Sequence, residues 1–178
     1  MARIRIELPA SFAFSTDIPL LVSHINYGNH LDNAQLLGLV SEARVRFLKS
    51  MGYGELDVEG LGIIVADAAL QYRSEAFHGE TMRVAMAAGD FHTHGCDLPW
   101  QMTEAASGRE VARGKTGIVF FDYRERCKAP VPDGFRRRFP AAWARHGARA
   151  GGGGRWRPRR ADGGGRARRP GVRGDGVR

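Results

Sequence analysis

The stretch NYGNHLDNAQLLGLVSEARVRFLKSM (residues 26–51) joins a polar turn to a strong helical pattern. Its first nine residues are mostly types that turn a chain, cap a helix or form hydrogen bonds. From there on, apolar side chains recur on one broad face at about 100° per residue. They are Leu36, Leu37, Leu39, Val40, Ala43, Phe47, Leu48 and Met51. The spacing predicts a helix over residues 32–51, capped by Asp32 or Asn33 and ended by Gly52.

The segments around this helix have the shorter period of β-strands. A strand is expected over residues 12–25, bent or at a sheet edge because of Pro19, and a glycine-punctuated loop over residues 53–61. Four further β-rich segments follow, at residues 62–74, 80–94, 96–106 and 109–124. The breaks between these four are short, so we expect antiparallel neighbours.

One helix cannot cover both faces of such a sheet. The predicted class is therefore α+β, with an antiparallel sheet of about five strands wrapped around one long central helix. The uncovered face and the sheet edges would then need a partner, so a homodimer or homotetramer is expected.

The net charge of +8 is distributed very unevenly along the 178 residues. Residues 136–178 carry 14 Arg, no Lys and two Asp, whereas residues 1–135 have a net charge of −4. We expect one domain over residues 1–138 and a Gly/Arg-rich disordered tail over residues 139–178. Such a tail can bind RNA or anionic surfaces without sequence preference, but an unstructured extension is the interpretation that we favour. The acidic body does not favour nucleic-acid binding.

Several classes of protein are disfavoured by composition. Two cysteines, Cys96 and Cys127, are too few for a disulfide framework, which favours reduced thiols and a cytoplasmic setting. No stretch approaches the ~20 apolar residues of a membrane helix, and no signal peptide is visible. The His and Cys residues lack zinc-type spacing, so neither a metal nor another cofactor is expected.

The polar turn and the helix resemble the 4-hydroxybenzoyl-CoA thioesterase-like branch of the hotdog fold. That branch typically shows Asp-x-x-Gly-His-Val-Asn-Asn-Ala, followed by a helix containing Glu-Ala-Arg. The matching residues here are His30, Asn33, Ala34, Glu42, Ala43 and Arg44. The plant acyl-carrier-protein thioesterases also have a histidine at the position of His30. YRSEAFHGETMRV and TGIVFFDYRERCKAPVP resemble later strands of these enzymes, so the resemblance covers roughly residues 12–135.

This resemblance implies a hotdog fold and hydrolysis of acyl-CoA or acyl-carrier-protein thioesters at the start of the helix. There, backbone N–H groups can polarise the thioester carbonyl. The implied catalytic residues are Asn26, His30, Asp32, Asn33 and Glu42. The substrate is expected to contact Tyr27, Gly28, Asn29, Asp67 and Arg73.

The sequence departs from the family pattern at two positions of the turn. Asn26 stands where the catalytic Asp is usual, and Asn29 stands where Gly is usual. An amide cannot serve as a nucleophilic carboxylate or as a base at neutral pH. A catalytically impaired acyl-CoA-binding or regulatory protein is therefore the alternative function.

Each candidate residue also has a purely structural interpretation. Asp32 and Asn33 are typical helix caps, His30 can be a hydrogen-bonded structural histidine, and Asn26 can satisfy the loop backbone. Glu42 can form an i,i+4 ion pair with Arg46.

Three further candidates lie on the predicted strands. Asp67 lies in an apolar segment and needs a partner there, whether or not it lines the site. Arg73 and Lys115 can meet phosphates of coenzyme A, although most cations on strands are simply exposed to solvent.

Overall fold

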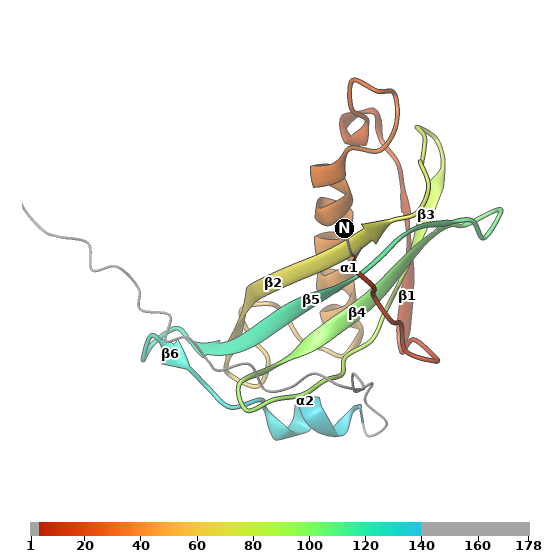
Figure 1. Cartoon of the computed structure of the whole chain (residues 1–178). Helices are drawn as coiled ribbons and strands as arrows, with labels where there is room; N and C mark the ends of the chain where they lie inside the picture. Colours follow the sequence, from red (N-terminus) through yellow and green to blue (C-terminus); the bar gives the residue numbers. More distant parts are fainter. Residues whose placement is uncertain (1–3, 140–178) are drawn as a thin grey trace, which may run out of the picture. The chain divides into compact units, whose positions relative to one another are not determined.

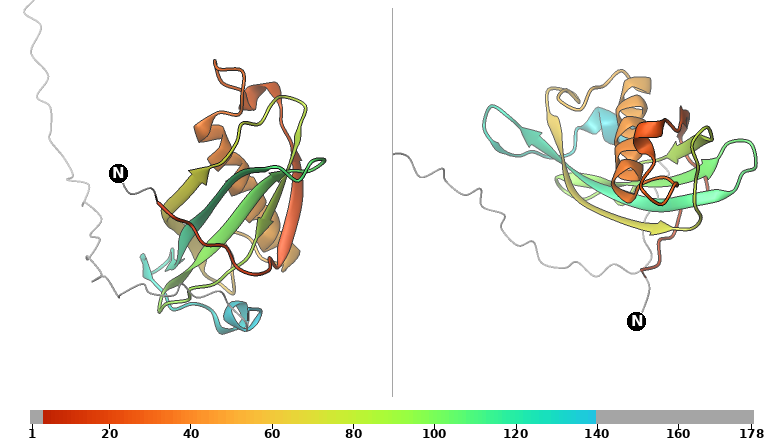
Figure 2. Two further views of the ribbon diagram at one scale, coloured as in Figure 1. Left: turned by 45° about the vertical axis from the view of Figure 1, so that its right-hand side comes forward. Right: turned by 90° about the horizontal axis from the view of Figure 1, so that it is seen from above.

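The long helix α1 (Asn33–Ser50) lies on the concave side of a curved antiparallel sheet (Figures 1 and 2). The computed structural model describes residues 4–139, so the predicted tail lies outside the described residues except for Phe139, which packs against the core. The sheet contains β1 (Phe14–Pro19), β2 (Gly62–Tyr72), β3 (Thr81–Met86), β4 (Gly95–Glu104), β5 (Glu110–Asp122) and β6 (Cys127–Lys128). The spatial order is β1-β3-β4-β5-β2, and β6 pairs with β5. This arrangement confirms the predicted fold class, with the two-residue β6 as a sixth strand.

The helix forms where the apolar period predicts it. Its buried face includes Leu36, Leu39, Val40, Ala43, Phe47 and Leu48. This face packs on the central strands, whose helix-facing side chains are also buried: Cys96, Leu98, Trp100, Met102, Ala112, Ile118 and Phe120. Arg44 is buried on the same helix because its guanidinium forms an ion pair with Glu55, with Nε and Oε1 2.7 Å apart.

Two expected strands are shorter than predicted. The segment predicted over residues 12–25 is a strand only as far as Pro19, and a short 3₁₀ helix, η1 (Val22–His24), follows it. The segment predicted over residues 80–94 leaves the sheet after Met86, and Asp90 adopts a φ of 47° in the loop beyond it. Pro19 has no N–H to continue a ladder, and a left-handed residue breaks one.

The expected pairing of the second and third strands is wrong. β2 lies at the far edge beside β5, while β3 lies between β1 and β4. Side-chain burial explains this order. Nearly every residue of β4 is buried, whereas the middle of β2 is exposed, so β4 belongs at the centre and β2 at an edge. The short connection after β2 therefore crosses the end of the sheet instead of forming a hairpin.

One end of the core is closed by a short helix that the sequence analysis does not predict, α2 (Asp133–Arg137). Phe135 is fully buried there, and its ring centroid lies 5.4 Å from that of Phe120 and 5.3 Å from that of Phe139. Aromatic side chains bury large apolar areas, so a single turn of helix is enough to seal this end.

Candidate active site

The turn before α1 is organised by the side chain and backbone of Asn26. Its Oδ1 accepts a hydrogen bond from the Gly28 N–H at 2.8 Å, and its own N–H donates to the His30 carbonyl at 2.9 Å. Its carbonyl accepts from the Asn29 N–H at 3.0 Å. Asn29 adopts a φ of 62°, a conformation that asparagine tolerates better than most residues. Asn26 therefore holds the turn from both sides.

The imidazole of His30 is fixed through one of its two nitrogens. Nδ1 lies 3.2 Å from the carbonyl oxygen of Leu31 and 3.5 Å from Nδ2 of Asn26. The shorter contact, to a carbonyl that can only accept, places the proton on Nδ1. Nε2 is then left as an acceptor, which is the form of histidine that can take a proton from water.

The first turn of α1 leaves one backbone donor unused. The Oδ1 atom of Asp32 accepts from the N–H groups of Ala34 and Gln35, at 2.8 and 3.2 Å, and the Leu36 N–H donates to the Asp32 carbonyl. Asp32 is thus the N-cap of the helix. Within residues 4–139, the N–H of Asn33 has no acceptor, and it lies at the positive end of the helix dipole.

A cavity of about 240 Å³ opens beside this helix terminus. The 26–32 turn reaches it through the Leu31 N–H, which donates to the Ala76 carbonyl at 2.8 Å. The cavity brings together His30 and Asn33 from the turn and the helix with Arg73 from the end of β2. Its other lining residues are Leu31, Leu36, Tyr72, Ser74, Glu75, Ala76 and Val111.

The polar lining residues Tyr72, Ser74 and Glu75 are not among the site residues that the sequence predicts. Among the described residues, the carboxylate of Glu75 has no hydrogen-bond or ion-pair partner, although its backbone carbonyl accepts from Arg109. The sequence signal for Glu75 is the segment YRSEAF, which belongs to the part that resembles the related enzymes.

The sequence of this domain matches one family model. That model describes the thioesterase-like superfamily and matches residues 20–139. The chain belongs to the thioesterase-like superfamily. Membership supports thioester hydrolysis as the class of activity, and it covers the turn, α1, the whole connection after β2 and the strands that line the cavity.

Solved structures place this thioesterase-like chain among proteins of the same fold. A putative thioesterase from Pseudomonas aeruginosa has a TM-score of 0.66 at 22% identity, over 72% of this chain and 99% of that one. A 1,4-dihydroxy-2-naphthoyl-CoA thioesterase from Synechocystis gives 0.63 at 20% identity, over 69% and 92%. A 12:0-ACP thioesterase from Umbellularia californica gives 0.62 at 16% identity, over 75% and 51%. At these identities the likeness shows the fold alone. No curated protein was found to match in sequence.

Two expected site residues of the thioesterase-like chain lie elsewhere. Glu42 is exposed and forms an ion pair with Arg46, at 2.7 Å between Oε1 and Nε. The carboxylate of Asp67 points to the other face of the sheet, where it lies 3.1 Å from Nζ of Lys115. Lys115 also contacts Asp97, at 3.0 Å to Oδ1. Each carboxylate is therefore held by a cation outside the cavity.

The remaining expected contacts lie at the turn and at the cavity rim. Tyr27 is fully exposed, and Gly28 and Asn29 are also exposed, outside the cavity lining. Arg73 does line the cavity, and its Nε lies 3.6 Å from Oε2 of Glu110, with 47% of its side chain exposed. Arg73 is thus a half-exposed cation of the cavity lining, in a long ion pair with Glu110.

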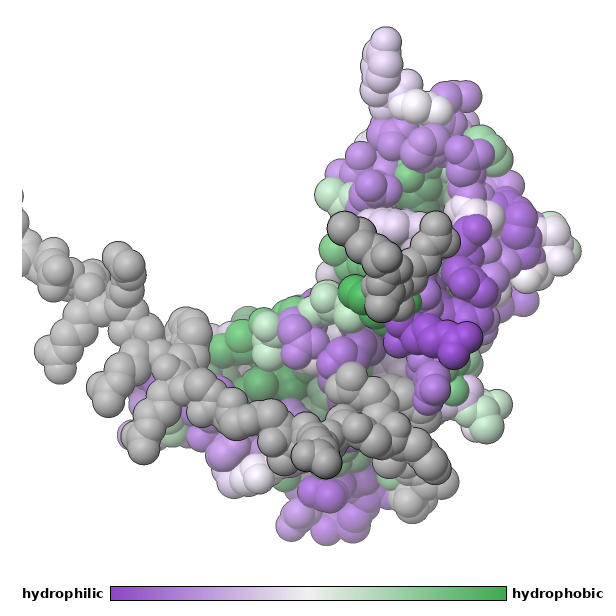
Figure 3. All heavy atoms as spheres, in the orientation of Figure 1, coloured by the Kyte–Doolittle hydropathy of each residue, from purple (hydrophilic) through white to green (hydrophobic). Residues whose placement is uncertain are grey.

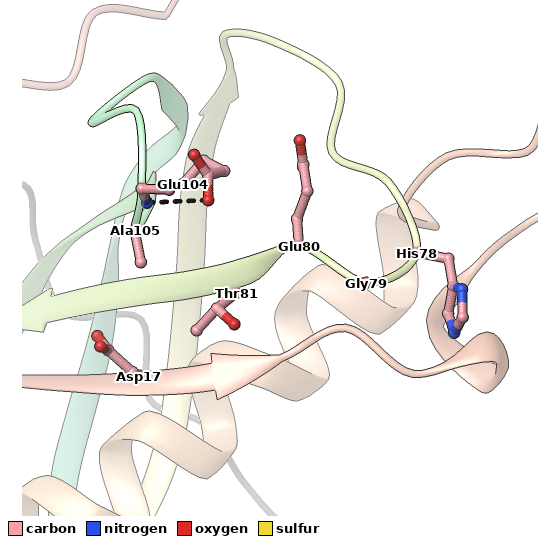
Figure 4. A pocket seen from close by; sticks show the side chains of 8 residues that line it. Asp17, His78, Gly79, Glu80, Thr81, Glu104 and Ala105 are labelled. Carbon is pink, nitrogen blue, oxygen red and sulfur yellow. Dashed lines mark hydrogen bonds between the residues drawn. The ribbon is translucent and has the colours of Figure 1, made fainter.

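A second, wider depression of about 860 Å³ lies between the end of β1 and the turn after β4 (Figure 4). Its carboxylates all have partners. Asp17 is bound by both nitrogens of the Arg83 fork at 2.8 Å, and Glu80 lies 2.7 Å from Nη2 of Arg109. Glu104 accepts hydrogen bonds from the turn that follows it. These groups stabilise the domain and leave no carboxylate in this depression for chemistry.

Two further observations concern the described residues as a whole. Residues 4–139 contain no helix that is long and apolar enough to cross a membrane. In the same part of the chain, no three His, Cys, Asp or Glu side chains gather as a metal ion would require. Cys96 is buried in β4 and Cys127 is exposed on β6.

Proposed function

We propose that this chain hydrolyses acyl thioesters of coenzyme A, or of an acyl-carrier protein, at the mouth of α1. The observation that carries the proposal is that two residues of one cavity lining, His30 and Asn33, have a proton acceptor and an unused N–H donor. His30 supplies the acceptor at Nε2, and Asn33 supplies the donor at its backbone N–H. An attacking water needs the first group, and the oxygen of a thioester carbonyl needs the second.

The reaction follows from these two positions. A water molecule attacks the thioester carbonyl carbon while Nε2 of His30 takes one of its protons. The carbonyl oxygen becomes negative and accepts a hydrogen bond from the Asn33 N–H, where the helix dipole adds to the stabilisation. The carbon–sulfur bond then breaks, and the departing thiolate takes the proton from the imidazolium. The products are a carboxylic acid and a free thiol.

Asn26 acts as a positioning residue in this scheme. Its amide cannot take a proton, but its Oδ1 holds the turn that carries His30, through the Gly28 N–H. We assign to Glu75, which lines the same cavity as His30, the negative charge that the usual aspartate would bring.

Arg73 is the group that we assign to the phosphates of the thiol carrier. It stands at the cavity rim and half of its side chain faces solvent. A planar guanidinium binds phosphate oxygens through paired N–H donors. Loss of this contact should raise KM for acyl-CoA more than it lowers kcat.

The assembly that we propose is a homodimer formed through β2. This 11-residue strand ends the sheet order, so one of its edges has no strand beside it among residues 4–139, and the Ile63 N–H at its start is bound there by the Glu55 carbonyl. Asp67 is its single charged residue, and its exposed residues include Val65 and Tyr72. In Figure 3, apolar side chains reach the surface where β2 and β5 run in Figure 1. An exposed, long and mostly apolar edge favours pairing with a second copy.

The test is release of thiol from acyl-CoA substrates by the full-length chain and by the His30→Ala variant. Turnover by the wild-type protein and a fall of about a hundredfold or more in kcat/KM for the variant are expected. His78→Ala is the matched control, because His78 is an exposed histidine outside the cavity.

Two outcomes would contradict the proposal. Full activity of the His30 variant would remove the assigned base. Binding of acyl-CoA by the folded wild-type protein without any release of thiol would favour the acyl-CoA-binding alternative.

A further inference from the structure

We infer that the substrate carries a compact acyl group, of the size of a short chain or a single aromatic ring, and not a long fatty chain. This inference rests on the proposed function, because it assigns the acyl group to the cavity beside His30. The cavity measures about 240 Å³, which is below the ~300–1,000 Å³ of sites that enclose drug-sized ligands.

The walls of the cavity match a small acyl group in polarity as well as in size. Its floor consists of Leu31, Leu36, Ala76 and Val111, all of which are buried and apolar. Its rim carries the polar groups, including His30 and Asn33. An acyl group that rests on this floor leaves its carbonyl at the rim, next to the proton acceptor and the unused donor.

An irregularity in the sheet builds part of the floor. Pairing between β4 and β5 passes from Met102–Ala112 to Thr103–Glu110, so Val111 is an extra residue on β5. A bulge of this kind redirects a side chain, and Val111 lines the cavity with its side chain buried at 2% exposure.

The space behind the floor is filled by side chains. Met102, beside Val111 in the sheet register, is fully buried, and so is Trp100, two residues further along. The indole of Trp100 lies against Gly114 so closely that a Cβ there would be 2.3 Å from its Cζ2 atom. At the far end, Phe135 closes the space between helix and sheet.

A longer acyl chain therefore has no free path along α1. Further methylenes would have to displace fully buried side chains from a close-packed core. The limit on chain length follows from this packing, and it predicts a specificity profile that can be measured directly.

The experiment measures kcat/KM of the full-length protein for acetyl-, butanoyl-, octanoyl-, palmitoyl- and benzoyl-CoA. Long substrates are kept below their micelle concentrations. We expect the highest values for a short-chain or benzoyl substrate and values lower by about tenfold or more for palmitoyl-CoA. Val111→Ala and Leu36→Ala enlarge the cavity. Both variants should raise the ratio of kcat/KM for octanoyl-CoA to that for butanoyl-CoA. Leu39→Ala is the control, because it removes a buried leucine from the same helix outside the cavity lining.

The outcomes separate this inference from the proposed function. Turnover that is fastest on palmitoyl-CoA would overturn the size limit and leave the thioesterase proposal standing. Without turnover on any substrate the thioesterase proposal fails, and the same acyl-CoAs then serve as stable ligands in calorimetry. Tightest binding of acetyl-, butanoyl- or benzoyl-CoA would still support a compact acyl site. Tightest binding of palmitoyl-CoA, or no binding at all, would overturn it.

Discussion

The backbone of Gly28 lies so close to the ring of His30 that a Cβ on Gly28 would stand 2.9 Å from Nε2. The same Cβ would be 3.1 Å from Oδ1 of Asn26. The glycine is thus needed for close approach, because every larger residue would press on the proposed base and on the side chain that holds the turn.

We predict that Gly28→Ala lowers kcat by about tenfold or more while the fold stays intact, because the ring of His30 must shift. Thiol release and a thermal unfolding curve check both parts. Gly38→Ala is the control, since its nearest atom, Oε1 of Gln35, is 3.9 Å away and a helical alanine should add about 0.5–1 kcal/mol. Unchanged kcat for Gly28→Ala would argue against His30 as the base.

Asp32 offers a way to separate capping from catalysis. Its Oδ1 caps the helix, so Asp32→Ala should lower the free energy of unfolding by about 1 kcal/mol. Asp32→Asn keeps an acceptor at the same place and should keep both stability and most activity. Denaturant unfolding and thiol release measure the two effects. If Asp32→Asn is stable but as inactive as His30→Ala, Asp32 is a base and the proposed assignment fails.

The sequence predicts those parts of the structure that depend on neighbouring residues, and not those that depend on contacts between distant segments. The helix was predicted over residues 32–51 and runs over Asn33–Ser50, because its apolar period and its cap are local features. The placement of β2 beside β5 is not local, since it depends on which strands the core can bury on both sides. The five-residue α2 is too short to show a period at all.

The site residues also fall into those that local spacing predicts and those that distant segments contribute. The turn and the start of α1 place His30 and Asn33 together, so their spacing in the sequence was sufficient. Glu75 reaches the cavity only because the connection after β2 crosses to the 26–32 turn. Glu42 and Asp67 were expected at the site, but cations on neighbouring elements hold them elsewhere. Such pairings between distant segments leave no local signal.

The carboxylate of Glu104 makes the stability of the domain depend on pH in the acid range. The Ser107 hydroxyl donates to it at 2.6 Å, and the N–H groups of Ala106 and Ser107 donate at 3.0 and 2.7 Å. These bonds lower the pKa of Glu104 from its ordinary value of 4.5 to about 2. Because the folded pKa is the lower one, the stabilisation is present above about pH 4.5 and is lost as the pH falls towards about 2.

We therefore predict that Glu104→Gln makes stability less sensitive to acid. The difference in unfolding midpoint between about pH 6 and about pH 3 should be smaller than for the wild type. Glu125→Gln is the control, because this exposed side chain has no partner among residues 4–139. An equal acid dependence in the wild type and in Glu104→Gln would show that the turn does not depend on this carboxylate.

The free edge of β2 can be tested by a single charge. Ala68 is exposed in the middle of the strand, and a lysine there disfavours strand pairing between chains. Light scattering should give a mass of at least twice the chain mass of 19.5 kDa for the wild type, and a lower mass for Ala68→Lys. Ala106→Lys adds the same charge at an exposed turn and should leave the mass unchanged. A wild-type protein that is monomeric would exclude the proposed dimer.

The packing of α2 over one end of the core has a consequence for folding during synthesis. Phe135 and Phe139 belong to the core, yet they come after every strand and after the long helix in the order of synthesis. A nascent chain that has emerged only as far as β6 contains every strand of the sheet. One end of its apolar core is still exposed, because α2 is missing. Exposed apolar surface of this kind is what chaperones bind. Chains that end just before Phe135 should therefore be bound by chaperones or degraded. Chains that also include Phe135 and Phe139 should fold with this end of the core covered.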